Sequence, residues 1–433
     1  MKVTRRLFCP KRSMVIMCAV ALILLLHSTN SPAQVGSDDL RDEVKALLDR
    51  VRALEAEVQA LKASQAGSAE PRETATNTAS RAPQLPPGTP AESSTQLPVY
   101  GGASAAAKAL NPDIGIIGNF VAAAGHNSVN QLPALALQES EISLQSIVDP
   151  YARADFFLAI GENDIEVEEG YVTFTSVPWG FVPKVGRMRA AFGRVNTFHN
   201  HTLPWVDRPL VAFNLMGGSL EEADVGIKDT GISISRILPA PKGIFLEGTG
   251  EVFRGDSGSL FHSSRRPDVS VVGHLKGYRD LTESTNIELG GSYTRGHNDL
   301  GSDFITKLYA MDATLRWKPV RGPRLHSFTA RTELVWSNRE QVAAAQRAFG
   351  FFASAEYQLG RRWFTGGRYD WSERAQNALQ HDSGGSLVLT YWPTEFSQIR
   401  GQLRRTNYAE GQTANELLFQ VLFTLGAHGA HPF

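Results

Sequence analysis

The sequence predicts an all-β protein, a transmembrane antiparallel β-barrel of about 16 strands. From residue 111 onwards, segments of roughly ten residues alternate apolar and polar side chains, and turns separate the segments. In one segment Tyr309 and Met311 share one face, whereas Asp312 and Thr314 share the other. Successive side chains of a strand point to opposite faces. One apolar face and one polar face, repeated along the chain, is typical of a barrel with lipid outside and water inside.

Residues 1–33 are predicted to be a secretory signal peptide. Five basic residues precede an apolar core from Met14 to Leu26, and small residues at 31–33 provide a cleavage site. An uncleaved membrane anchor is the alternative. Both cysteines of the chain, Cys9 and Cys18, lie in this segment. The chain after residue 33 is therefore expected to have no thiol chemistry and no disulfide.

Residues 34–63 are predicted to form a short coiled-coil helix. Apolar residues within 38–62 alternate spacings of four and three, with Val at the a positions and Leu at the d positions: Leu40, Val44, Leu47, Val51, Leu54, Val58 and Leu61. This choice of residues favours a two-stranded coil. A single amphipathic helix lying on another surface is the alternative. We expect this segment to lie in the periplasm.

Residues 64–110 are predicted to be a disordered linker. Pro, Ser, Thr, Ala and Gly dominate the segment, with five prolines between 83 and 98. Such a composition cannot bury a core and favours a semi-extended chain.

Residues 111–433 are predicted to be the outer-membrane barrel. The expected strands are 114–124, 136–147, 152–160, 165–176, 181–189, 225–237, 243–254, 268–278, 285–296, 306–318, 325–337, 349–359, 362–371, 385–392, 395–408 and 413–426. Short turns alternate with longer polar connections at 125–135, 190–224, 255–267, 338–348 and 372–384. Short periplasmic turns and long external loops are typical of outer-membrane barrels. Both ends of the barrel should then face the periplasm, which requires an even number of strands.

Aromatic residues give independent support for a barrel in a membrane. Outward positions near short turns hold Trp317, Trp363 and Tyr391, and outward positions near long loops hold Tyr293, Trp336 and Trp371. Two rings of outward aromatic side chains form the girdles of a membrane barrel. A water-soluble β-sandwich also alternates, but it has no reason to place its aromatic residues in this way.

Charged residues at inward positions are expected to line the pore, because a charge facing lipid costs about 2–4 kcal/mol near the bilayer midplane. The predicted lining residues are Arg153, Asp155, Glu247, Glu251, Lys276, Asp312, Arg316, Arg331, Glu333, Arg368, Asp370, Arg400 and Arg404. They form either a wall of paired charges that keeps the pore hydrated or a selectivity ladder built on Arg368, Arg400 and Arg404.

The longest interruption of the strand pattern is 190–224. Its place and length resemble those of the loop that folds into the barrel of sixteen-stranded general porins. We therefore expect this segment to narrow the pore, with constriction residues Arg187, Arg189, Arg194, Asp207 and Arg208. The four arginines are expected to set the ion preference.

No catalytic, cofactor or metal site is predicted. His199 and His201 could reach one ion, but two ligands alone more often make hydrogen bonds than bind a metal. Ser292 and His274 lie on neighbouring predicted strands without the strand–turn–helix context of a hydrolase nucleophile. The chain is therefore not expected to be an enzyme. Residues 34–433 carry 38 basic and 44 acidic residues, and this balance gives no indication of the concentrated basic surface that nucleic-acid binding needs.

The order of segments, together with residues 149–155 and the stretch Val185-Gly186-Arg187 to Phe192-Gly193-Arg194, resembles the phosphate-selective porin O and P family. The resemblance covers 111–433. It implies a sixteen-stranded outer-membrane channel, commonly trimeric, that passes anions.

These observations predict a porin-like channel in the outer membrane of a Gram-negative-type bacterium, for passive diffusion of small hydrophilic solutes or ions. Expected partners are outer-membrane lipid, further copies of the chain in a trimer, and the barrel-assembly machinery. The terminal Phe433 resembles the aromatic signal that this machinery recognises. The alternative is a structural barrel, tethered to the periplasm or cell wall through its coiled coil.

Overall fold

The computed structural model describes Lys45 and residues 112–162, 165–218 and 225–426. The predicted signal peptide, the linker, Phe433 and all of the predicted coiled coil except Lys45 lie outside the described residues. The described residues from 112 onwards belong to the second of two compact units, Gly101–Phe433.

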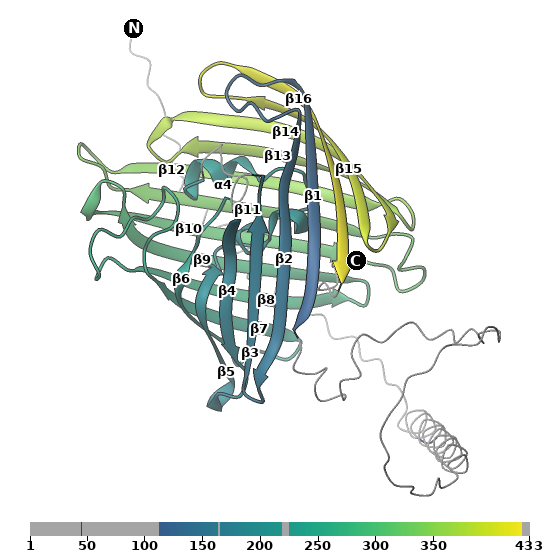
Figure 1. Cartoon of the computed structure of the whole chain (residues 1–433), viewed down its shortest axis with the longest axis horizontal. Helices are drawn as coiled ribbons and strands as arrows, with labels where there is room; N and C mark the ends of the chain where they lie inside the picture. The colour runs from purple at the N-terminus through teal and green to yellow at the C-terminus, as the bar shows by residue number, and fades with distance from the viewer. Residues whose placement is uncertain (1–44, 46–111, 163–164, 219–224, 427–433) are drawn as a thin grey trace, which may run out of the picture. The chain divides into compact units, whose positions relative to one another are not determined.

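Sixteen antiparallel strands form a closed barrel, as the alternation predicted (Figure 1). The strands are β1 Asp113–His126, β2 Leu135–Asp149, β3 Ala152–Ile160, β4 Ile165–Phe174, β5 Phe181–Arg189, β6 Lys228–Ile237, β7 Ile244–Phe253, β8 Ser270–Thr282, β9 Thr285–Asn298, β10 Gly301–Trp317, β11 Phe328–Arg339, β12 Gln346–Gln358, β13 Trp363–Arg374, β14 Asn377–Thr394, β15 Ser397–Asn407 and β16 Thr413–Gly426. Each strand pairs with its sequence neighbours, and β1 closes the ring against β16 from Gly115↔Gly426 to His126↔Asn415. Closure leaves no unpaired strand edge, which a chain in lipid requires.

The two faces of the wall differ as a membrane barrel requires. On β10 the outward Tyr309 is 47% exposed, whereas the inward Asp312 and Thr314 are 6% and 1% exposed. Leu387, Leu403 and Leu417 are exposed on the outer face of neighbouring strands. An apolar outer surface of this kind is stable only against lipid or another apolar surface.

Outward aromatic residues pair across neighbouring strands. The Trp363 and Tyr391 rings lie 4.5 Å apart near the short turns. Towards the other rim, the Phe349 ring lies 5.2 Å from Trp336 and 6.0 Å from Trp371. These pairs fit the predicted positions of the two girdles.

One predicted long connection is absent. Residues 372–384 belong mostly to strands, because β13 runs to Arg374 and β14 begins at Asn377. Polar residues ended the predicted strands too early at this rim. A strand that extends beyond the bilayer no longer needs an apolar outer face, so its alternation disappears while its backbone pairing continues.

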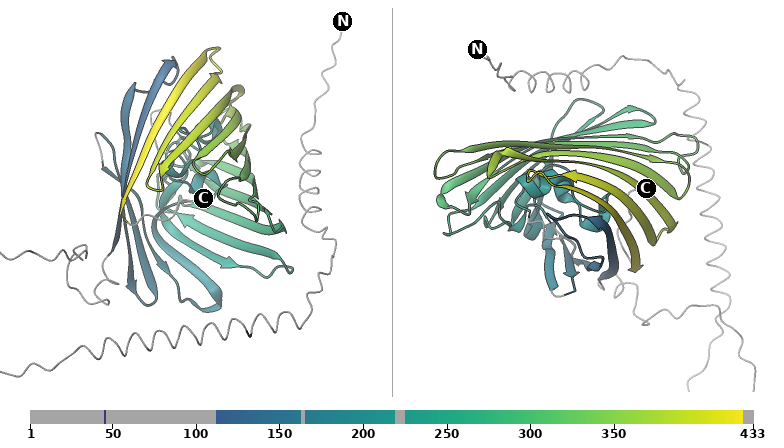
Figure 2. Two further views of the ribbon diagram at one scale, coloured as in Figure 1. Left: turned by 90° about the vertical axis from the view of Figure 1, so that its right-hand side faces the viewer. Right: turned by 90° about the horizontal axis from the view of Figure 1, so that it is seen from above.

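The described part of the connection between β5 and β6, residues 190–218 and 225–227, lies within the ring of strands (Figures 1 and 2). It contains two short 3-10 turns, η2 Val195–Thr197 and η3 Asn200–Thr202, and the six-residue helix α4 Leu210–Leu215. A third 3-10 turn, η1 Pro178–Gly180, joins β4 to β5. Within the described residues, no helix is long and apolar enough to cross a membrane.

Candidate functional site

The β5–β6 connection carries its own apolar core. Phe192, Leu203 and Leu215 are 0%, 1% and 0% exposed. Trp205 is 3% exposed and meets the ring of Phe352 edge-on, with 5.3 Å between ring centroids. Apolar side chains therefore fix this segment against the inner wall, where a water-filled pore would present polar groups.

The wall supplies a matching apolar surface, which the sequence analysis missed. Leu308, Val335, Phe352 and Val388 are inward residues of β10, β11, β12 and β14, and all are buried in one cluster with the loop. The missed signal is local loss of alternation, as in residues 308–311, which are apolar on both faces of β10. A strand that is apolar on both faces indicates that something covers each face.

Carboxylates of the wall hold the first part of the loop. Glu251 on β7 accepts a hydrogen bond from the backbone N–H of Ala191 at 2.8 Å. Glu333 on β11 accepts from the N–H groups of Arg194 at 3.0 Å and Val195 at 3.1 Å. These two predicted pore-lining residues therefore bind the loop backbone.

Guanidinium groups of the wall hold the later part of the loop through Asp207. The Asp207 carboxylate accepts from Arg368 at 3.0 Å, from Arg404 at 2.8 Å and from the Gln402 amide at 2.5 Å. Burial alone would raise the pKa of Asp207. The positive charges of Arg368 and Arg404 outweigh this effect and lower the pKa to about 2. Arg368 also lies over the Trp205 ring, 4.8 Å from its centroid.

Two further inward residues bind the loop backbone. Arg400 on β15 donates to the carbonyl oxygens of Leu203 at 2.8 Å and Trp205 at 3.1 Å. Asp370 on β13 accepts from the N–H of Leu210 at 3.2 Å. These predicted lining residues therefore anchor the loop, and their charged groups bind the loop backbone.

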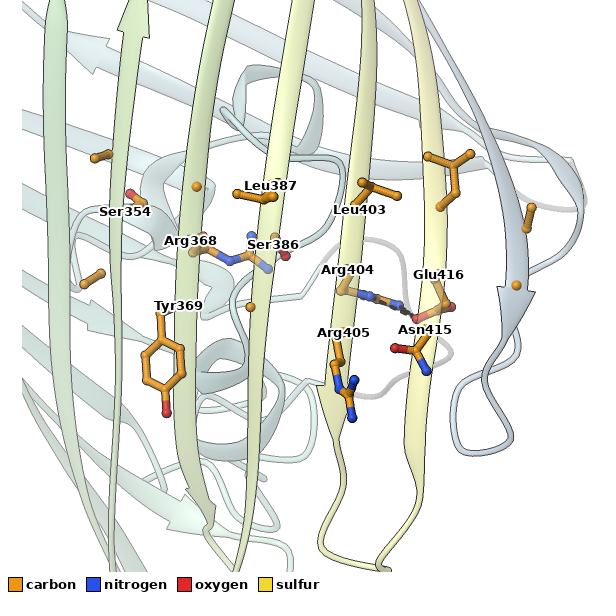
Figure 3. Close-up of a pocket in the computed structure, with 17 residues that line it drawn as sticks. Ser354, Arg368, Tyr369, Ser386, Leu387, Leu403, Arg404, Arg405, Asn415 and Glu416 are labelled. Carbon is orange, nitrogen blue, oxygen red and sulfur yellow. Dashed lines mark hydrogen bonds and ion pairs between the residues drawn. The ribbon is translucent and has the colours of Figure 1, made fainter.

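The same strands border a hollow of about 1020 Å³ that reaches from β12 to β1 (Figure 3). Arg404 bonds Glu416 on the neighbouring β16, as the dashed line in Figure 3 marks. Arg405, the next residue, lies on the opposite face of β15. Alternation thus separates the arginine that anchors the loop from the arginine that faces outward.

The predicted constriction residues do not all lie in one place. Lys184 and Met188 of β5 line an internal cavity, so Arg187 lies on the opposite, outer face of this strand. Arg187 pairs there with Glu166 at 2.9 Å. Arg189 is 6% exposed and pairs with Glu168 at 2.8 Å.

Arg208 lies inside the fold of the loop. It is 3% exposed and donates to the Asn200 side-chain oxygen at 2.9 Å. It also donates to the carbonyl oxygens of Val195 at 3.2 Å and Phe198 at 2.6 Å. Arg208 therefore joins η2 to η3 and keeps the loop compact.

Arg194 faces an internal cavity of about 350 Å³, to whose lining Arg189 also contributes. It pairs with Glu288 of β9, and its guanidinium lies 5.2 Å from the Phe198 ring centroid. The cavity has charges of both signs and lies between the loop and strands β4 to β10; its lining includes Thr197, Lys184, Glu247, Glu251, His274, Lys276, Glu288 and Asp312. Lys276 of β8 pairs with Glu247 of the neighbouring β7 at 3.2 Å.

The remaining predicted lining residues pair along the wall. Arg316 lies 3.5 Å from Glu288, and Arg153 bonds Asp155 on its own strand at 2.7 Å. Arg331 is half-buried on the inward face of β11, two residues from Glu333. Paired charges of this kind keep a wall polar without leaving an isolated charge.

His274 and Ser292 lie within hydrogen-bond distance, at 2.8 Å between Nδ1 and Oγ. The Ser292 oxygen also accepts from the backbone N–H of Gly193 at 2.9 Å. In the described part of the chain, no carboxylate is hydrogen-bonded to His274. The pair therefore joins the loop to the wall and lacks the orienting acid of a hydrolytic triad.

His199 and His201 meet carboxylates that the sequence analysis did not connect with them. Glu141 of β2 and both histidines place one ligand atom each within 4.8 Å of one another. The signal that could have found this group is weak, because Glu139 and Glu141 are inward on β2 but their distance from the loop depends on the tertiary fold.

No protein-family model matches the sequence. An uncharacterized protein of Aquifex aeolicus is 30% identical over 349 residues, which cover 71% of this chain and 72% of that protein. The chain belongs to the family of this Aquifex protein. Identity at this level over most of both chains indicates common descent and a common fold.

Solved structures show which fold that is. OprB of Pseudomonas putida, determined at high pH, superposes with a TM-score of 0.51 at 8% identity, over 74% of this chain and 95% of that one. A loop L8 deletion mutant of OmpT, an outer membrane protein of Vibrio cholerae, gives 0.50 at 10% identity, over 73% and 100%. The chain therefore has the fold of outer-membrane barrels, with sixteen strands.

Proposed function

We propose that this protein is a porin-like channel of the outer membrane for passive diffusion of small hydrophilic solutes or ions. The closed barrel with an apolar outer face supports a place in a membrane. Likeness in fold to OprB and to OmpT supports the outer membrane in particular. The resemblance to porins O and P supports a homotrimer, with the predicted coiled coil in the periplasm.

One observation carries the proposal: the loop packs on the wall and leaves a polar cavity beside it. The apolar cluster of the loop includes inward residues of β5, β7, β8, β10, β11, β12 and β14, and the polar cavity is lined by the loop and by residues of β4 to β10. We propose that solutes pass through this part of the lumen and that the inward-folded segment 190–224 narrows it. Arg194 of the loop would then face Glu247, Lys276 and Asp312 of the wall at the constriction. Asp207, Arg189 and Arg208 would act by holding the loop in place.

The test is conductance in planar lipid bilayers, with the untagged and folded protein. We expect discrete ohmic steps and a reversal potential in a salt gradient that shifts towards cation preference in Arg194→Gln, because a positive charge leaves the constriction. Arg187→Gln is the matched control, since Arg187 lies on the outer face of β5, and should leave the reversal potential unchanged. A shift in the control alone would contradict the assignment of the constriction.

A second function has its own support. The loop binds β2, β4, β7, β9, β11, β13 and β15, as expected of a filled lumen. A structural barrel tethered to the periplasm or cell wall would make such contacts without conducting. A folded, heat-modifiable barrel without conductance would favour this function over the channel.

A further inference from the structure

We propose that the loop and the barrel wall together form a binding site for a divalent transition-metal ion such as Zn²⁺. The site consists of His199 and His201 from the loop and Glu141 from β2, with Glu139 as the fourth ligand. The proposal does not depend on conduction, because binding at this site can be measured in the absence of a bilayer.

Two strands bring the carboxylates to the loop. Glu139 and Glu141 are two residues apart on β2, so both point into the barrel, where they are 4% and 1% exposed. On β4 the register shifts between Phe157/Leu158 and their partners, which leaves Glu168 as an extra residue. This bulge turns both Glu168 and Glu169 inward, and they are 1% and 8% exposed.

The loop places its two histidines between these glutamates. His199 precedes η3 and His201 lies within it. The two rings lie 5.6 Å apart between centroids. His199 Nδ1 is 2.8 Å from the Glu141 Oε2 atom, and His201 Nδ1 is 3.4 Å from the same oxygen. His201 Nδ1 is also 3.7 Å from the Glu139 Oε1 atom.

These distances fit a small tetrahedral site. Nitrogen and oxygen ligands bound to Zn²⁺ at about 2.0–2.1 Å lie about 3.3 Å from one another in a tetrahedron. The separations of 2.8, 3.4 and 3.7 Å bracket this value. Small side-chain movements of the loop histidines would therefore complete the coordination. Two imidazoles and two carboxylates suit Zn²⁺ and Co²⁺ better than Ca²⁺ or Mg²⁺, which prefer all-oxygen sites.

Unsatisfied carboxylate oxygens give an independent reason for a cation here. Oε1 of Glu139 and Oε1 of Glu141 are buried without a hydrogen-bond partner. A buried charged oxygen left in this state is costly, and a bound cation removes the cost.

The ion would connect the loop to the wall at one edge of the lumen. His199 is 13% exposed as a side chain, so an ion could enter from the lumen, whereas His201 is 2% exposed and lies deeper. Metal binding should therefore hold η3 against β2 more firmly. This effect would add to the hydrogen bonds of Asp207, which lies beyond η3 in the sequence.

The experiment uses the untagged, folded full-length barrel in detergent, stripped with a chelator, dialysed against ZnCl₂ and then washed. We expect about one bound zinc per chain by elemental analysis, and visible absorption bands of tetrahedral Co²⁺ after cobalt loading. His199→Ala with His201→Ala should abolish both signals. Glu141→Gln, which preserves shape, should weaken zinc binding without altering heat-modifiability.

A second pair of histidines provides the matched control. His262 and His297 lie 3.7 Å from Asp256 and 4.0 Å from Asp268, respectively, away from the proposed site. His262→Ala with His297→Ala should retain zinc binding. Absence of bound zinc in the wild-type barrel would overturn the proposal. So would full zinc binding by the His199 and His201 double variant or by Glu141→Gln.

Discussion

Asp207 is the residue on which the later part of the loop most depends, since two guanidinium groups and an amide converge on its carboxylate. Its pKa of about 2 lies below the ordinary value of 3.8, so the carboxylate is bound more strongly as an anion in the folded state. This interaction stabilises the fold fully above about pH 4 and is lost as the pH falls towards 2. The difference corresponds to about 2 kcal/mol.

We therefore predict that acid loosens the loop reversibly between about pH 4 and pH 2. Conductance in bilayers should rise over this interval, because a loosened loop obstructs the lumen less. Asp207→Asn should show the higher conductance already at neutral pH. Its conductance should not rise further on acidification. The matched control is Asp229→Asn, which removes another buried carboxylate, one that binds the backbone of residues 255 and 256. An acid step of unchanged size in Asp207→Asn would assign the titration to another group.

Gly193 is a position where backbone and packing both demand glycine. Its φ is 60°, and a Cβ there would lie 2.2 Å from the Oε1 atom of Glu333. The left-handed backbone costs about 1–2 kcal/mol for another residue, and the clash would add to this cost.

We predict that Gly193→Ala displaces the start of the loop and lowers the thermal stability of the folded barrel by more than the backbone cost alone. Gly180→Ala is the matched control, since Gly180 has a φ of 73° and nothing within 4 Å of the added Cβ. Thermal melts monitored by heat-modifiability compare the two variants. Equal shifts in the two melting temperatures would show that Glu333 moves aside without cost.

At the scale of elements, the loop behaves as a small core inserted in the barrel. Trp205 contacts both Phe352 and Arg368 of the wall. Truncation of a buried aromatic side chain commonly costs about 3–5 kcal/mol. This energy is shared between the loop and the wall, whereas the barrel keeps its own backbone pairing.

We predict that Trp205→Ala releases the loop without unfolding the barrel. Proteolysis of the detergent-solubilised protein should then cleave within 190–224, while heat-modifiability remains. Trp179→Ala serves as control, because Trp179 lies in η1 and is 80% exposed; it should leave cleavage unchanged. Loss of heat-modifiability in Trp205→Ala would show that the loop is required for barrel folding.

The elements also show what a single sequence can predict. Alternation along β10 predicted the strand, its two faces and the barrel, because a period of two is a local property. The position of Arg187 on the outer face was harder to predict, because a shift of one residue along a strand exchanges the faces that point to lipid and to the lumen. The grouping of Glu141 with His199 depends on the path of the loop past β2. This path is a tertiary feature that spacing alone does not contain.

At the scale of the whole molecule, the barrel completes its own hydrogen bonding. β1 pairs with β16 over twelve residue pairs, so the ring closes within residues 113–426. Nothing in this closure requires a segment before residue 112. The predicted coiled coil and linker are therefore expected to contribute to association, and the barrel to fold independently of them.

We predict that deletion of residues 38–62 leaves a folded, membrane-inserted and heat-modifiable barrel with an unchanged single-channel step. Its oligomers should dissociate at lower temperature or lower detergent concentration, because the coil would raise the local concentration of subunits through the linker. Semi-native electrophoresis over a temperature series measures both properties. The control replaces 38–62 with a Gly/Ser segment of equal length, which keeps the distance to the barrel and removes the heptads. Unchanged oligomer stability would show that the segment binds a different periplasmic partner, and an unfolded barrel would show that it belongs to the fold.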